Sequence, residues 1–174
     1  MNPSEALLLE LLDTMRRTGA ALRRVRRRLA GRFPVSAERL AGFDEDTTAW
    51  TDALLKRVEQ MVDAHRSATR VVVKLIGEED KYRTQRQILD RLASFDVVPD
   101  PLRVLKLIEL RNRTVHAYAP ESEKQAGLLN EAWAAIPELL DLAARLARFV
   151  REEKLLPAAA GPVLAAPEAL AAPI

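Results

Sequence analysis

The longest helical pattern in the sequence lies at residues 44–77 and reads DEDTTAWTDALLKRVEQMVDAHRSATRVVVKLIG. Within it, apolar or weakly polar side chains recur every three or four positions, which places them on one face of a helix. These residues are Trp50, Leu54, Val58, Met61, His65, Thr69, Val72 and Ile76. Asp44 or Asp46 suits the start of this helix, and Gly77 suits its end. The stretch therefore predicts a long amphipathic helix.

Similar patterns on both sides predict four more helices. We expect them at residues 4–31, 82–95, 101–118 and 121–154, with irregular connections at 33–42 and 96–101. Ser4 is a candidate cap for the first helix, and Pro101 suits the first turn of the fourth. Pro137 lies inside the last helix and is expected to kink it. The sequence thus predicts an all-α domain over residues 1–154, an antiparallel up-and-down bundle of four to five helices.

The remaining segment, residues 155–174, is rich in Ala and Pro and carries a single charge, so we expect a disordered tail. Two apolar stripes are long for one small bundle, and this favours a homodimer. The length of 174 residues fits one domain.

The composition excludes several classes of protein. There is no cysteine, which rules out disulfide scaffolds, thiol nucleophiles and Cys-based metal sites. Six glycines and 5% aromatic residues argue against a β-sandwich or barrel. No apolar stretch reaches the ~18 residues of a membrane span, and the N-terminal apolar run lacks a basic segment before it. We therefore expect a soluble, cytoplasmic protein without membrane contact.

The net charge of +2 conceals an uneven distribution along the chain. Residues 1–32 carry eight arginines and three carboxylates, a net charge of +5, whereas residues 33–154 carry −2 and residues 155–174 carry −1. Such a basic helix is a candidate nucleic-acid surface, with Arg23, Arg24 and Arg27 as its weak candidate RNA contacts. The alternative is a solvated helix face whose arginine stems cover apolar surface.

The densest polar chemistry lies at residues 111–118, which read RNRTVHAY. The chain has two histidines and two tyrosines, and His116 and Tyr118 fall here beside Arg111 and Asn112. An imidazole can transfer protons near neutral pH, and a guanidinium can stabilise a phosphate. Arg111 and His116 lie about 140° apart on an ideal helix. Either the helix ends within this window, or a second chain completes the site.

A structural interpretation of the same window stays open. His116 and Tyr118 would then form local hydrogen bonds at a helix end, and Arg111 would pair with Glu109 or Asp100. Elsewhere, His65 lies in an apolar stripe and is expected to be an interior or interface histidine whose hydrogen bonds are satisfied, rather than a catalytic one. Trp50 and Trp133 are expected in the core. No metal site is expected, because the two histidines lie far apart and no acidic ligand pattern surrounds either.

The spacing Arg-x4-His-x-Tyr, formed by Arg111, His116 and Tyr118 with Asn112 directly after the arginine, resembles that of the HEPN superfamily. These are all-α proteins named for higher eukaryotes and prokaryotes nucleotide-binding. The chain is most similar to HEPN toxins encoded beside a minimal nucleotidyltransferase (MNT) antitoxin. Gly77-Glu78, Tyr82-Arg83 and the Gln-Ile-Leu at 87–89 precede the motif at a similar spacing, so the resemblance covers residues 1–154.

The resemblance implies a homodimeric, metal-independent endoribonuclease whose two motifs face each other across the interface, with no cofactor. Arg111 would stabilise the phosphate, His116 would act as general acid or base, and Asn112 would orient the substrate or His116. The RNA 2′-hydroxyl would attack its own phosphate, leaving a 2′,3′-cyclic phosphate and a 5′-hydroxyl. Arg113 would contact phosphate or simply be solvated.

The resemblance also implies a means of control, because the MNT antitoxin adenylylates the tyrosine that matches Tyr118 and so silences the nuclease. Two alternatives remain. One is a HEPN-like dimer that binds nucleotides or partners a nucleotidyltransferase without cutting RNA. The other is a helical bundle with a purely structural role.

Overall fold

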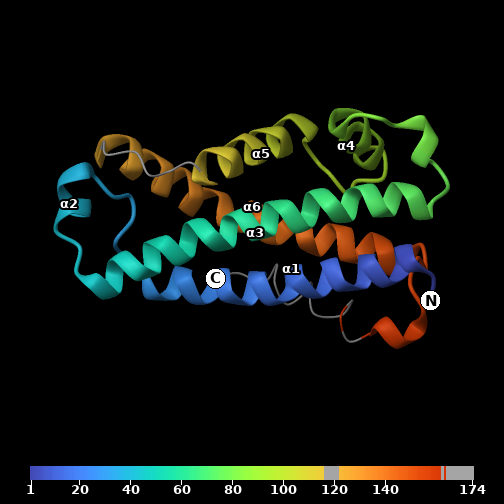
Figure 1. The fold of residues 1–174 in the computed structure, drawn as a ribbon, viewed down its shortest axis with the longest axis horizontal. Helices are drawn as coiled ribbons and strands as arrows, with labels where there is room; N and C mark the ends of the chain where they lie inside the picture. Colours follow the sequence, from blue (N-terminus) through green and yellow to red (C-terminus); the bar gives the residue numbers. More distant parts are fainter. Residues whose placement is uncertain (116–121, 162, 164–174) are drawn as a thin grey trace.

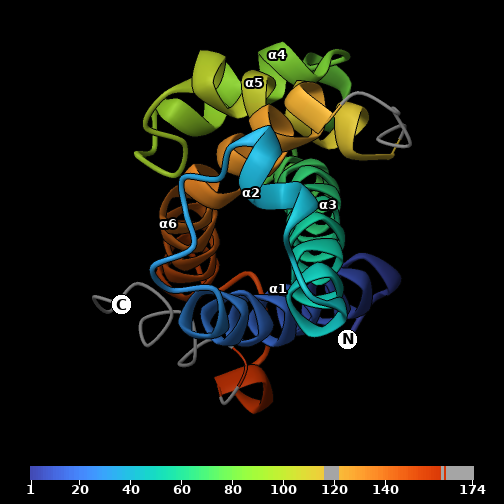
Figure 2. The same ribbon diagram turned by 90° about the vertical axis from the view of Figure 1, so that its left-hand side faces the viewer.

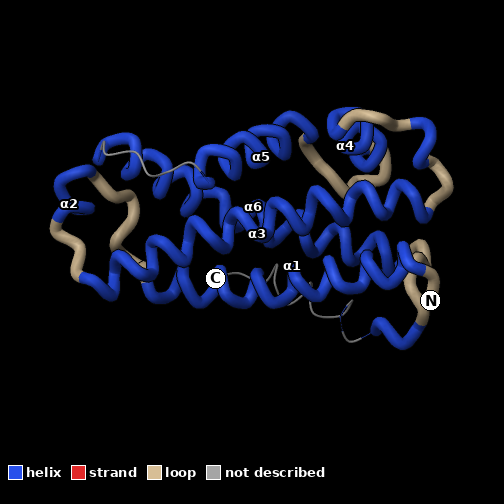
Figure 3. The backbone as a smooth tube through the Cα atoms, viewed as in Figure 1, coloured by secondary structure: helices blue, strands red, loops and turns tan. Residues whose placement is uncertain are grey.

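The computed structural model describes residues 1–115, 122–161 and 163, and every regular element in this part of the chain is helical (Figures 1 and 3). The α-helices are α1 (Pro3–Arg28), α2 (Ala37–Ala41), α3 (Glu45–Leu75), α4 (Gln85–Ala93), α5 (Pro101–Val115) and α6 (Ser122–Glu152). Two 3₁₀ turns, η1 (Glu79–Lys81) and η2 (Ala158–Ala160), complete the set. The all-α prediction is confirmed.

The long helix α3 begins and ends where the sequence predicts. The Asp44 side chain accepts a hydrogen bond from the backbone N–H of Thr47 at 2.7 Å, which satisfies one of the free donors of the first turn. After the helix, Gly77 adopts a left-handed conformation with φ +76°, which a residue with a side chain rarely adopts. Pro101 likewise occupies the first position of α5, as expected.

The start of α1 differs from the expectation. Asn2, rather than Ser4, caps the helix: its side chain accepts from the N–H of Glu5 at 2.9 Å, and the Glu5 carboxylate accepts from the N–H of Asn2 at 2.9 Å. This reciprocal capping box lies two residues earlier because Pro3 suits the first helical position. At its other end α1 finishes at Arg28, three residues before the predicted limit.

The connection at 33–42 contains a short helix that the pattern does not predict. Ser36 caps α2 by accepting from the N–H of Arg39 at 3.2 Å. The segment is fixed to α6 by Asn130, which accepts from the N–H of Val35 and donates to its carbonyl, both at 2.8 Å. Five residues are too few for a recognisable helical period, so the sequence pattern does not predict α2. Its position depends instead on Asn130, a residue 95 positions after Val35 in the chain.

Helix α3 is the central element of the described fold. It contacts α1, α4, α5 and α6. Viewed along the long axis, α1 lies on one side, α4 and α5 lie on the opposite side, and α3 and α6 lie between them (Figure 2). The helices α1 and α3 run in opposite directions along this axis (Figure 1). Fully buried side chains from the three longest helices fill the interior, among them Leu12, Leu22, Leu54, Met61, Leu129 and Ile136.

The chain after α6 partly departs from the expected disordered tail. Leu156 and Ala160 are 7% and 4% exposed and belong to the hydrophobic core. Both are apolar residues in the segment after α6, and their burial removes apolar surface from water. The prediction of a disordered tail is therefore wrong for the part that contains Leu156 and Ala160. Residues 162 and 164–174 lie outside the described residues.

Candidate functional site

Arg111 lies in the C-terminal half of α5, and the local sequence explains how this helix is held. The Asp100 side chain accepts from the N–H of Arg103 at 3.1 Å and caps the first turn. Val104, Leu107 and Leu110 are buried and seat one face of α5 on the core. Arg111 directly follows buried Leu110, so its side chain lies at the edge of this buried face rather than on the solvent-exposed face of the helix.

The guanidinium of Arg111 is paired with a carboxylate of α3. Its Nη2 lies 2.7 Å from Oδ2 of Asp63, 48 residues earlier in the chain. The Arg111 side chain is 28% exposed, and its Nη1 makes only a long contact of 3.4 Å with Oδ1 of Asn112. The bond with Asp63 raises the pKa of Arg111, and the charge of Glu59 adds to this effect, so the guanidinium keeps its charge.

This finding corrects the partners expected for the structural interpretation. Neither Glu109 nor Asp100 pairs with Arg111. Asp100 caps α5 instead, and Glu109 lies close enough to Arg113 to help raise the pKa of that residue. Asp63 was missed because nothing in the local spacing marks it: it sits between buried Val62 and Ala64 in α3, and only the packing of α5 against α3 brings it to Arg111.

Arg113 faces away from Arg111. The two residues are two positions apart, which corresponds to a rotation of about 200° around the helix axis. The Arg113 guanidinium forms a bidentate ion pair with the Glu131 carboxylate of α6. This pair raises the pKa of Arg113 and lowers that of Glu131. The structure therefore places the two arginines of the motif on opposite sides of α5, one held by α3 and the other by α6.

The other motif residues are placed only in part. Asn112 is exposed, and Thr114 closes the last turn by donating to the carbonyl of Arg111 at 2.7 Å. His116 and Tyr118 lie outside the described residues. Helix α5 is described as far as Val115, whose side chain is 41% exposed.

The arginines of α1 divide into two groups. Arg24 and Arg27 are exposed, as the nucleic-acid prediction requires, whereas Arg23 is half-buried. Arg26 and Arg28 instead lie over the rings of Trp133 and Trp50, at 5.5 and 5.6 Å from the ring centroids. Both tryptophans are partly buried and packed against the core, as predicted from the sequence.

His65 is an interior histidine, as predicted, but within the described residues its imidazole is not fully hydrogen-bonded, contrary to the expectation. It is 4% exposed and lines a small cavity of about 10 Å³ with Val104 and Leu107 of α5 and Leu139 of α6. Its Nε2 is buried without a hydrogen-bond partner among the described residues. Burial lowers the pKa of His65 to about 4, so the imidazole is neutral at pH 7.

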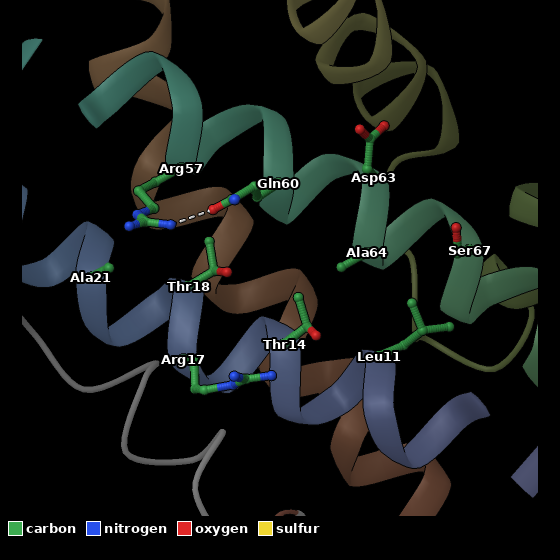
Figure 4. Close-up of a pocket in the computed structure, with 10 residues that line it drawn as sticks. All are labelled: Leu11, Thr14, Arg17, Thr18, Ala21, Arg57, Gln60, Asp63, Ala64 and Ser67. Carbon is green, nitrogen blue, oxygen red and sulfur yellow. Dashed lines mark hydrogen bonds between the residues drawn. The ribbon is translucent and has the colours of Figure 1, made fainter. Parts of the chain in front are cut away.

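A groove between α1 and α3 adjoins the Arg111 pair. Its volume is about 570 Å³, and its polar lining comes from Thr14, Arg17 and Thr18 of α1 and from Arg57, Gln60 and Asp63 of α3 (Figure 4). The Asp63 carboxylate points out of the groove, away from Arg17 and Arg57 (Figure 4). Sequence patterns did not indicate this groove, because its two walls lie more than 30 residues apart in the chain.

The described residues form neither a metal site nor a membrane-spanning helix. In the part of the chain that the structure describes, no three His, Asp or Glu side chains are grouped so that they could hold a metal ion. None of the described helices is long and apolar enough to cross a membrane. A comparison of the chain with protein-family models found no match, and comparisons with curated proteins and with solved structures found none either.

Proposed function

We propose that the protein is a metal-independent endoribonuclease, the toxin of a HEPN/MNT pair, acting in the cytoplasm as a homodimer of helical bundles. The observation that carries the proposal is the placement of Arg111, a charged guanidinium held by Asp63 in the C-terminal half of α5, five residues before His116. Asp63 fixes one terminal nitrogen of this guanidinium, and the other has only a long contact with Asn112.

This arrangement suits phosphate binding. A guanidinium presents its donors in a flat fork, so fixing one end by a carboxylate sets the direction of the other end. Nη1 is then available to an RNA phosphate beside Asn112. Such a preorganised donor stabilises the charge that builds on phosphorus in the transition state.

The proposed reaction needs RNA and two proton transfers. The 2′-oxygen attacks the adjacent phosphorus, its proton passes to a general base, and the bond from phosphorus to the 5′-oxygen breaks as that oxygen receives a proton. His116, one from each copy of the chain, supplies base and acid. The products are a 2′,3′-cyclic phosphate and a 5′-hydroxyl. The antitoxin silences this site by attaching AMP to Tyr118, which brings a bulky anion to the phosphate site of Arg111.

The Arg111–Asp63 pair also favours a second candidate, a structural role for Arg111. The contact joins α5 to α3 and would do so in a protein without catalytic activity. In that case the motif would belong to a HEPN-like module that binds nucleotides or a nucleotidyltransferase and does not cut RNA.

The chain offers a matched control that separates these candidates. Arg111 and Arg113 lie two residues apart in the C-terminal half of α5, and both pair with a carboxylate of a neighbouring helix. We expect purified full-length protein to cleave RNA in EDTA, Arg111→Ala and His116→Ala to lose this activity, and Arg113→Ala to keep most of it. Thermal unfolding of all four proteins gives the accompanying change in stability.

Two outcomes would contradict the proposal. If the unchanged protein leaves tRNA and mRNA intact, the ribonuclease function is wrong. If Arg111→Ala and Arg113→Ala lose activity equally and in proportion to their loss of stability, Arg111 is structural.

A further inference from the structure

The groove between α1 and α3 carries more positive charge than its own carboxylates balance. The Arg57 guanidinium donates to the neutral side chain of Gln60 at 2.6 Å, and no carboxylate of the described residues lies within ion-pair distance of it. Opposite, Arg17 shares a single carboxylate, that of Asp13, with Arg16. Asp63 is the one acidic residue among those that line the groove in the described structure, and its carboxylate points out of the groove and pairs with Arg111.

The shape of the groove fits a narrow, extended ligand. Two neighbouring helices, α1 and α3, form the walls of the groove, an arrangement that suits a strand lying along them. Ala21 and Ala64 leave space because their side chains are short, and the hydroxyls of Thr14 and Ser67 offer hydrogen bonds along the walls (Figure 4). The volume of about 570 Å³ lies in the range of ligand sites.

The charge continues along α1 beyond the groove. Arg24 and Arg28 follow Arg17 by seven and eleven residues, a spacing that keeps all three on one side of the helix. At the far end, Arg28 lies over Trp50 of α3. From Trp50 to Asp63 the helix α3 rises about 20 Å, the length of a few extended nucleotides. A basic track thus leads from Trp50 along the groove to Asp63, the partner of Arg111.

We propose that the α1–α3 groove binds the sugar–phosphate backbone of single-stranded RNA, with Arg17 and Arg57 on its phosphates, and leads the strand to Arg111. The inference rests on the proposed ribonuclease function for the identity of the strand. Phosphate contacts of this kind position a strand without reading its sequence.

The test measures binding separately from cleavage. A labelled 2′-O-methyl oligoribonucleotide has no free 2′-hydroxyl and cannot be cut by internal attack, so its fluorescence anisotropy with the full-length protein reports binding alone. The variant is Arg17→Gln with Arg57→Gln. The matched control is Arg83→Gln with Arg148→Gln, which removes the same charge from two exposed arginines outside the groove.

We expect the groove variant to bind roughly tenfold more weakly and the control variant to bind as the unchanged protein does. The slope of log affinity against log salt should fall by about 1.4, since each lost contact to a single strand removes about 0.7. Arg57→Lys, which keeps the charge, should retain most of the affinity. A strand that carries 4-thiouridine should crosslink to peptides containing residues 14–21 and 57–67.

Several results would overturn the groove assignment. One is equal binding by the groove and control variants, or crosslinks confined to other peptides. Another is a change in molar mass by light scattering in the groove variant alone, which would make the groove an interface between copies of the chain. Displacement of the strand by AMP or inorganic phosphate at comparable affinity would make it a small-molecule site.

The outcomes also separate this inference from the proposed function. Binding in the groove by a protein that cuts no RNA would refute the ribonuclease and leave the groove as a nucleic-acid site. If the groove variant cleaves unmodified RNA as fast as the unchanged protein does, the ribonuclease function stands and the groove assignment is refuted.

Discussion

The Arg111 guanidinium lies 2.7 Å from the Asp63 carboxylate, and this contact joins the C-terminal half of α5 to the middle of α3. The sequence motif places Arg111 in a functional window, and the structure adds the residue that orients it. Substitution of Asp63 therefore tests whether the pair contributes to catalysis or only to stability, as substitution of Arg111 does.

Asp63→Asn is expected to lower RNA cleavage with little loss of stability. Because both side chains are partly exposed, losing the ionic part of the pair should cost only about 0.5–1 kcal/mol of unfolding free energy. Because Arg111 would lose its fixed orientation, kcat should fall roughly ten- to a hundredfold. The guanidinium would still be free to bind phosphate, so KM should stay the same or decrease. Steady-state kinetics on a defined RNA measure both. Glu131→Gln, which breaks the Arg113 pair, is the control, and an equal fall in kcat there would remove the special role of Asp63.

Tyr118→Phe is expected to keep ribonuclease activity and to escape control by the antitoxin. Phenylalanine lacks the hydroxyl to which AMP would be attached. Intact mass of the protein, made with and without the nucleotidyltransferase that the proposal expects to be encoded beside it, should show additions in steps of AMP for the unchanged chain and none for the variant. AMP on the Phe variant would place the modification elsewhere.

Acid is expected to destabilise the fold through His65. The pKa of His65 is about 4 in the folded protein and about 6.5 when unfolded, so the unfolded state binds more protons between these values. Stability should therefore be fully present above pH 6.5 and fall by about 3 kcal/mol as the pH drops to 4. Urea unfolding at pH 7 and pH 5 measures the change. His65→Leu should show a much weaker dependence over this interval, and an unchanged one would assign the effect to other groups.

Asn130→Ala is expected to destabilise the protein by about 1–3 kcal/mol, because it leaves both backbone groups of Val35 without their partner. Chemical denaturation provides the measurement. The contrasting variant is Asn112→Ala, an exposed change at the motif that should leave stability unaltered while lowering RNA cleavage. Equal stability of both variants would show that the α2 connection is not held by this side chain.

Two glycines are expected to respond in opposite directions to alanine. Gly127 lies inside α6 with no neighbouring atom within 4 Å of an added Cβ, so Gly127→Ala should stabilise by about 1 kcal/mol. Gly77 has φ +76°, where a side chain is strained, so Gly77→Ala should destabilise by about 1 kcal/mol. Thermal unfolding should order the three proteins accordingly, and a stabilised Gly77→Ala would contradict the role of its conformation.

The features that the sequence predicts well are those set by neighbouring residues. Asp44, Gly77 and Pro101 mark helix ends through contacts and backbone preferences within one turn, and α6 runs past Pro137 to Glu152, close to its expected limit. The kink at Pro137 stays a prediction.

The features that it misses depend on distant partners. Asn130 holds α2 from 95 residues away, Asp63 meets Arg111 across 48, and the groove exists only because α1 lies beside α3. Local periodicity carries no information about which residue of one helix faces which residue of another. The spacing of Arg111 and Arg113 already implies that they lie on opposite sides of the helix. It does not indicate which carboxylates they pair with.

Residues 57–67 of α3 combine three properties on different sides of one short stretch of helix. Arg57 lines the groove, Asp63 holds Arg111, and His65 is packed under α5. A substitution that shifts this stretch by a fraction of a turn would disturb all three at once, so stability and the proposed activity should be hard to vary independently here. In a mutational scan we would expect these three turns to tolerate the fewest changes, and rescue of one variant to require compensation on another helix.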